Sequence, residues 1–177
     1  GYQFHNMQIC AEKHGLTPFS TMQNHYNLIY REDERELIPV CRQYGVSFIP
    51  YSPLAGGHLC HVGWLSSSKR SETDTTLRRK YDASKDNDME IIARVEDLAK
   101  RRGVSMTVIA LAWQYAKGAA SPMVGATNPD HFRDATQAVD VELTAEEIAY
   151  LEEPYRAHEI VGALKANRSL SHTMAKK

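Results

Sequence analysis

Polar and glycine-rich segments follow three short apolar runs of this 177-residue chain. They read "QNHYN" from Gln23, "YSPLAGG" from Tyr51 and "GATNP" from Gly125. Between them they offer a carboxamide, an aromatic ring, hydroxyls and glycines that let a backbone approach a phosphate closely. Thr127 and Asn128 precede a predicted helix, whose N-terminus favours an anion. Together these groups are suited to a nucleotide, although each signal is weak by itself.

The elements that would position these groups alternate between helices and short strands. Apolar spacing and end signals predict helices over 3–14, 32–45, 86–102, 106–118, 130–139 and 145–152, and strands over 18–27, 46–52 and 121–126. A long polar loop, 55–84, separates them and contains a predicted short helix at 74–81. Strands that are apolar on both faces and alternate with helices indicate an α/β fold with about three parallel strands covered by helices. Ligands bind such sheets at the carboxyl ends of the strands.

The local end signals are specific. Gly15 and Gly103 stand where helices should stop, and Ser105, Asn128 and Thr144 stand where helices should begin. Thr144 also has the spacing of a capping box with the glutamate three residues later. Pro39, inside the predicted helix 32–45, should kink it or limit its first turns.

Composition narrows the class of protein. The chain is 42% hydrophobic and 24% charged with a formal net charge of -1, which describes one ordinary globular domain and gives no indication of a nucleic-acid partner. No run approaches the ~18 apolar residues of a membrane span, so no membrane partner is expected. Three cysteines, Cys10, Cys41 and Cys60, form no disulfide framework and favour a reduced, cytoplasmic setting. The "HLCH" run, from His58 to His61, lacks the spacing of a zinc site, so no metal is predicted.

Longer stretches resemble a known family. The run "MQNHYNLIYREDERELIPVCRQYGVSFIPYSPLAGGHL" resembles the C-terminal half of the aldo-keto reductases, in the branch with bacterial and fungal sugar and aryl-alcohol reductases and potassium-channel β-subunits. "PMVGATNPDHFRDA" is similar to that family's last strand and cofactor-gripping helix, and "LTAEEIAYLEEPY" to the helix that follows. The resemblance implies that residues 1–160 are the C-terminal part of a (β/α)₈ TIM barrel and that 161–177 form a polar tail. It also implies NADP(H) as cofactor and a small-molecule aldehyde or ketone as substrate.

The resemblance assigns roles around the nicotinamide and the pyrophosphate. Gln23 matches the side chain that hydrogen-bonds the nicotinamide carboxamide, and Tyr51 matches the aromatic that stacks on the ring. Ser52, Leu54 and Gly56 match the turn that contacts the pyrophosphate, and the backbone at Gly125 is free to approach the same ligand.

Further roles fall around the adenosine. Thr127 resembles the residue near the 2′-phosphate, and Arg70 is similar to the loop arginine that clamps that phosphate, a contact to which a guanidinium is suited. His131 and Asp134 occupy helix positions that usually face the adenine. Family members often carry Asn or Gln at the positions of Ala135 and His131, so adenine binding is expected to be weaker or differently made.

Simpler interpretations exist for these residues. Tyr51 could be a core aromatic, Gln23 could satisfy backbone groups, and Arg70 and His131 could be solvated side chains. His25 and Tyr26 adjoin each other on a strand and point to opposite faces, so at most one of them faces the ligand.

Two hypotheses follow for the whole chain. The family's catalytic Asp, Tyr, Lys and His lie on strands before the segment that residue 1 matches, so no catalytic residue is assigned here. The chain is then either the cofactor half of an NADPH-dependent reductase, inactive alone, or a truncated, non-catalytic cofactor-binding or regulatory module. If the chain is produced alone, the open half-barrel is expected to be marginally stable or to self-associate. Substrate identity depends on variable loops and cannot be read here.

Overall fold

The computed structural model describes residues 1–64, 78, 80–126 and 128–161. Its α-helices are α1 (Tyr2–His14), α2 (Leu37–Gln43), α5 (Lys85–Arg102), α6 (Met106–Ala116), α7 (Pro129–Thr136) and α8 (Ala145–Glu152). Its strands are β1 (Thr21–Met22) and β2 (Ser47–Phe48), and its 3₁₀ turns are η1 (Glu32–Glu34), η2 (Ala55–Gly57), η3 (Asp82–Ser84) and η4 (Gln137–Asp140). Arg70 and Thr127, most of the predicted helix 74–81 and all of the tail beyond residue 161 lie outside the described residues.

The sheet is parallel, as expected, but its regular part is smaller than predicted. β1 pairs with β2 through Thr21 opposite Ser47 and Met22 opposite Phe48. The pairing continues as an isolated bridge between His25 and Tyr51. The predicted third strand, 121–126, makes one parallel bridge, from Met123 to Tyr51, and Ala119 just before it makes another to Phe48. Prolines at 50 and 122 interrupt the ladder, because proline has no N–H to donate. The fold is therefore α/β with a two-stranded parallel sheet extended by bridges.

The helices end where local signals predicted. Gly15 and Gly103 adopt left-handed angles, with φ of 64° and 66°, and their N–H groups close the last turns of α1 and α5. Ser105 and Asn128 accept hydrogen bonds from backbone N–H groups at the starts of α6 and α7. Thr144 forms the predicted capping box of α8. Short-range hydrogen bonding thus fixes these boundaries.

Two predicted helices are wrong in extent. The segment 32–45 splits into η1 and α2, and Pro39 lies in the first turn of α2, where a missing N–H costs little. The helix predicted over 130–139 ends at Thr136 and continues as η4.

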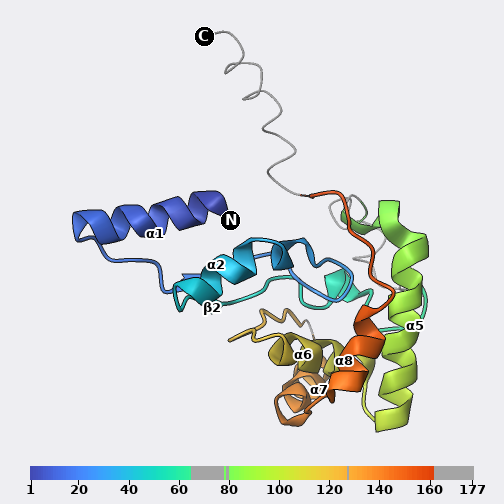
Figure 1. Ribbon diagram of the computed structural model, residues 1–177. Coiled ribbons are helices and arrows are strands. Elements are labelled where there is room, and N and C mark those ends of the chain that lie inside the picture. The colour runs from blue at the N-terminus through green and yellow to red at the C-terminus, as the bar shows by residue number, and fades with distance from the viewer. Residues whose placement is uncertain (65–77, 79, 127, 162–177) are drawn as a thin grey trace.

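The main core lies where α5 packs against α6 and α8 (Figure 1). Its most completely buried aliphatic and aromatic side chains include Ile91, Ile92, Val95, Leu98, Ile109, Trp113 and Leu151. A smaller cluster around Phe4, Leu37 and Val46 joins α1 to α2. Figure 1 shows α1 reaching away from the rest of the molecule. Within the described ranges, no helix is both long and apolar enough to cross a membrane.

Candidate functional site

A strained turn follows β2. Ser52 and Ala55 have φ of 53° and 50°, and Gly56 and Gly57 have φ of 66° and 112°. Positive φ is uncommon for residues other than glycine, so two such residues in one turn mark a conformation that the surrounding structure imposes. Hydrogen bonds from Ala55 N–H to Ser52 O (3.0 Å) and from Gly57 N–H to Leu54 O (2.9 Å) hold the turn.

Two adjoining cavities lie beside this turn, and we call them together the strand-end groove. The first has a volume of about 250 Å³ and is lined by Ser52, Pro53, Leu54, Gly56, Gly57, Cys60, Met123, Val124 and Gly125. The second has a volume of about 380 Å³ and is lined by Leu54, Cys60, His61, Ser105, Thr107, Val124, Gly125, Ala126, His131 and Asp134. Leu54, Cys60, Val124 and Gly125 line both cavities, so the groove runs from the turn after β2 to α7.

The groove brings together residues that are distant in the sequence. Of the predicted cofactor residues, its lining includes Ser52, Leu54, Gly56, Gly125, His131 and Asp134. Tyr51 directly precedes the turn, is half-buried, and bridges both His25 and Met123. Gln23 is exposed after β1 and lines neither cavity.

The lining of the groove is mostly backbone and small side chains. A Cβ atom added at Gly125 or at Gly57 would meet no heavy atom within 4 Å, so the space beside both glycines is open. Asp134 accepts a 2.6 Å hydrogen bond from Ser105 Oγ, which joins α6 to α7 across the groove floor. The lining named above contains no lysine or arginine, so a pyrophosphate there would depend on backbone N–H groups and on charges from elsewhere. The open glycines and the turn leave room for a dinucleotide beside the backbone.

The burial of Ala135 accounts for the absence of an amide side chain at this position, where family members often carry Asn or Gln. It is 7% exposed and packs with Val108, Leu111 and Ala138 beneath α7. Its side chain therefore faces the core, where a larger amide side chain would be overpacked. His131, by contrast, is exposed at the rim of the groove.

A buried polar cluster behind Tyr51 was not predicted. His25 Nε2 lies 2.6 Å from Tyr81 Oη, and Asn27 Nδ2 donates to Tyr81 Oη at 3.0 Å and to Ser52 O at 2.9 Å. The pKa of His25 is lowered to about 3, mainly by burial and further by the charges of Lys80 and His158. Strand alternation could have indicated that 25 and 27 share the face of Gln23. Nothing local indicated that Tyr81 would join them.

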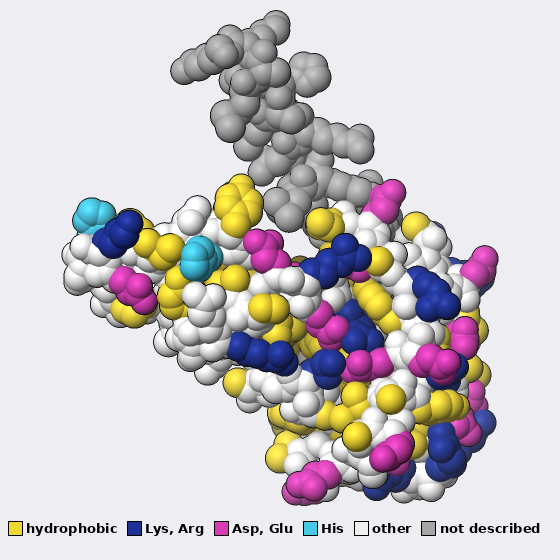
Figure 2. Space-filling view, in the orientation of Figure 1, with side chains coloured by type: hydrophobic (Ala, Val, Ile, Leu, Met, Phe, Trp, Pro, Cys, Tyr) yellow, Lys and Arg dark blue, Asp and Glu magenta, His cyan; other side chains and the backbone are white. Residues whose placement is uncertain are grey.

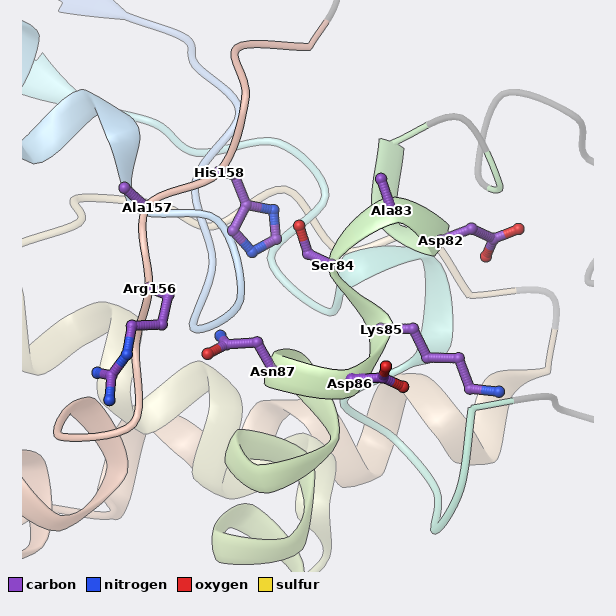
Figure 3. Close-up of a pocket in the computed structure, with 9 residues that line it drawn as sticks. All are labelled: Asp82, Ala83, Ser84, Lys85, Asp86, Asn87, Arg156, Ala157 and His158. Atoms are coloured by element: carbon purple, nitrogen blue, oxygen red, sulfur yellow. The ribbon is translucent and has the colours of Figure 1, made fainter.

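A separate cavity of about 420 Å³ lies between the start of α5 and residues 156–158. Figure 3 shows His158 and Asn87 pointing into the space between these segments, whereas Asp82 and Lys85 point away from it. His158 Nε2 lies 2.9 Å from Asp88 Oδ1, and Asp88 is completely buried. This contact fastens the segment after α8 onto α5. Burial raises the pKa of Asp88, and the hydrogen bond from His158 opposes that rise.

The "HLCH" run forms no metal centre among the residues that the structure describes, where no group of three or more potential metal ligands occurs. His58 is buried and stacks on Trp64 with ring centroids 4.2 Å apart. Cys60 lines the groove, and burial raises the pKa of its thiol.

Comparison with known proteins identifies the family. Residues 1–156 match the aldo/keto reductase family. A Schizosaccharomyces pombe protein provisionally named an aryl-alcohol dehydrogenase is 46% identical over 156 residues, which are 87% of this chain and 43% of that protein. The versiconal hemiacetal acetate reductase of Aspergillus parasiticus is 43% identical over 155 residues, 87% of this chain and 45% of that protein.

An aldo-keto reductase of Fusarium vanettenii is 40% identical over 161 residues, which are 91% of this chain and 43% of that protein. The chain thus spans less than half the length of these relatives. The family match covers the turn after β2, the groove and α7, which are the features built up above. The chain belongs to the aldo/keto reductase family.

Proposed function

We propose that this chain forms the NADP(H)-binding part of a reductase that converts a small aldehyde or ketone to an alcohol. Family membership and the reductase names of its relatives support a carbonyl reductase. The observation that carries the cofactor assignment is the strand-end groove, since predicted residues from two separate sequence segments, 52–56 and 125–134, line adjoining cavities that share four residues. We assign the reductase domain to residues 1–160.

Each part of the groove would then have its own task. The ring of Tyr51, at the end of the β2 segment, would support one face of the nicotinamide, and Gln23 would turn toward its carboxamide. The turn from Ser52 to Gly57 would hold the pyrophosphate against open backbone. His131 and Asp134 would flank the adenine beside α7. The bound cofactor supplies the hydride, and these residues orient it.

The substrate is proposed only as a class, a carbonyl compound of low molecular weight. Arg70 and Thr127 are proposed to recognise the 2′-phosphate that distinguishes NADPH from NADH. We assign proton transfer to no residue of this chain. The assigned work is cofactor binding and orientation.

A blocking substitution tests the cofactor assignment. Gly125→Leu extends a side chain into the open space that both cavities share, so the fold should tolerate it while the groove is filled. We expect the purified chain to bind NADPH saturably, measured by NADPH fluorescence and by quenching of Trp64 and Trp113, and Gly125→Leu to weaken binding at least tenfold.

Ala120→Leu is the matched control, because Ala120 is exposed on the same segment and lines neither cavity. It should bind NADPH like the original chain. No saturable binding by the original chain, or equal binding by Gly125→Leu, would overturn the assignment.

A further inference from the structure

The cluster of His25, Asn27 and Tyr81 lies directly behind the proposed nicotinamide platform and has no task in the function above. All three side chains are buried, His25 with 6% exposure and the other two with none. Burying three polar groups is costly unless their hydrogen bonds are satisfied. The arrangement of these bonds therefore indicates what the cluster does.

The donors and acceptors of the cluster can be assigned by counting. Ile29 N–H donates to Asn27 Oδ1 at 3.1 Å, which identifies that atom as the oxygen and leaves Nδ2 as a donor. Its two hydrogens go to Ser52 O and to Tyr81 Oη. Tyr81 Oη therefore accepts from Asn27. The hydroxyl proton of Tyr81 goes to His25 Nε2, at 2.6 Å, because the described residues offer that hydroxyl no other acceptor. His25 is then neutral and carries its hydrogen on Nδ1.

Nδ1 of His25 has no partner among the described residues. Leaving a buried donor unpaired costs about 1–3 kcal/mol. The neutral imidazole of His25 is thus kept in this orientation at a cost in stability. Its remaining contacts are made through the two faces of its ring.

Those faces connect the cluster to Tyr51. The His25 ring lies nearly parallel to the ring of Tyr30, with centroids 4.2 Å apart, and to that of Tyr51, with centroids 5.3 Å apart; the interplanar angle is 16° in both cases. His25 and Tyr51 are also paired across the sheet. Asn27 holds the carbonyl of Ser52, the residue that follows Tyr51. One cluster therefore contacts both the ring of Tyr51 and the backbone beside it.

We propose that His25 and Tyr81 are positioning residues that fix the ring of Tyr51 for a planar heteroaromatic ligand ring. Tyr81 donates to His25, and His25 stacks on Tyr51, so a residue from the far end of the 55–84 loop sets the orientation of the platform. The identity of that ligand ring as nicotinamide rests on the proposed function. The low pKa of His25 accords with the neutral ring assigned above.

The first test needs no cofactor. Tyr81→Phe keeps the aromatic volume and removes the hydroxyl that orients His25. The matched control is Tyr26→Phe, which also removes a buried hydroxyl, here donating to Glu34 at 2.5 Å, from a ring that stacks on Trp113. In NMR spectra of the chain, the ring nitrogens of His25 should show hydrogen on Nδ1.

The NMR signals of the Tyr51 ring should shift in Tyr81→Phe and should not shift in Tyr26→Phe. Both variants should melt at a lower temperature than the original chain. Unchanged Tyr51 signals in Tyr81→Phe, or equal shifts in both variants, would overturn the proposal.

The second test measures the consequence for binding. Tyr81→Phe should raise the dissociation constant for NADPH about tenfold, and Tyr26→Phe should raise it less than twofold. Equal weakening by both variants would reduce the role of Tyr81 to general stability and overturn the proposal. If the original chain binds no NADPH, the cofactor assignment fails, while the Tyr51 signals still decide whether the cluster positions that ring.

Discussion

Tyr51 combines the contacts that make an aromatic side chain a platform. Its ring stacks on His25, and Lys80 Nζ lies 5.0 Å from its ring centroid. The next residue, Ser52, holds a backbone angle that only the surrounding structure can impose. Backbone strain at Ser52 and buried polar contacts at His25 therefore occur at the same strand end as the proposed platform.

Arg70 is the residue on which we expect cofactor preference to depend. Arg70→Ala should raise the dissociation constant for NADPH about 10- to 100-fold, because a charge-assisted contact to the 2′-phosphate is lost, and should change NADH binding less than threefold. Titrations with both cofactors check this. Arg156→Ala, outside the groove lining, is the control. Equal losses for the two cofactors would remove Arg70 from the 2′-phosphate.

Asp33 should make stability fall as pH rises. Burial raises its pKa to about 6, above the ordinary value of 3.8. Between these values the unfolded chain loses a proton that the folded chain keeps, so stability decreases with rising pH and the loss is complete above pH 6. At pH 7.5, Asp33→Asn should therefore raise the free energy of unfolding by about 1–3 kcal/mol, measured by urea unfolding. At pH 4 the variant and the original chain should differ little.

Asp140→Asn, at an exposed position, is the control for that experiment. The same pH dependence in both variants would contradict the assignment to Asp33.

At the scale of elements, one serine joins two helices. Ser105 caps α6 by accepting from Val108 N–H at 3.2 Å, and its hydroxyl donates to Asp134 in α7. Thr144 caps α8 in a capping box with Glu147. The hydroxyl of Ser105 therefore adds a polar contact between α6 and α7 to the apolar packing of Ala135 against Val108 and Leu111.

Substituting both caps separates these roles. Ser105→Ala and Thr144→Ala should each lower the free energy of unfolding by about 1 kcal/mol through the lost cap, and Ser105→Ala by about 1 kcal/mol more through Asp134. Urea unfolding measures both. Only Ser105→Ala should also weaken NADPH binding, because Ser105 and Asp134 line the groove. A larger loss of stability in Thr144→Ala would show that the contact to Asp134 contributes nothing.

A second junction between elements is ionic. Arg31 binds Glu34 of η1 at 2.7 Å and Glu152 of α8 at 2.9 Å, and its guanidinium lies over the rings of Trp113 and Tyr155. Burial alone would raise the pKa of Glu34, but hydrogen bonds from Arg31 and Tyr26 lower it overall. Glu34 thus contributes stability above its ordinary pKa, and this contribution is lost as pH falls through the lowered value. The loop after β1 is held to the helical core in this way.

At the scale of the whole molecule, the surface over α5 and α8 is charged, whereas the surface along α1 is apolar. Figure 2 shows charged side chains of both signs gathered over α5 and α8, where Arg94, Arg101 and Arg102 are paired with carboxylates. Hydrophobic side chains are exposed along α1 and the loop after it, among them Tyr2 (64%), Met7 (54%), Leu16 (60%) and Phe19 (54%). Such a concentration of apolar surface favours association.

We therefore expect the chain alone to self-associate. Sedimentation velocity should show larger species as concentration rises. Replacing Met7 and Leu16 together by serine should shift the distribution toward monomer, whereas Val139→Ser, an equally exposed apolar position on η4, should not. A monodisperse monomer with a sharp, cooperative melt would contradict this expectation.

Local sequence signals predicted the capped helix ends well, although the helices predicted over 32–45 and 130–139 are shorter in the structure. The stops at Gly15 and Gly103 and the caps at Ser105, Asn128 and Thr144 are all present, because each depends on a few neighbouring backbone groups. The sheet was predicted less well. Its strands are interrupted by prolines and pair with distant segments, so apolar runs alone overstated their length.

The sequence by itself determined the α/β pattern, the family resemblance and the residue types at each strand end. Only the tertiary structure decided which of these residues meet: Leu54 with Gly125 and Asp134 along one groove, and His25 with Tyr81, which is 56 residues away. Helix caps and turns follow from interactions over a few residues. Contacts across such separations depend on how whole helices pack, and the charge state of His25 depends on the burial that this packing creates.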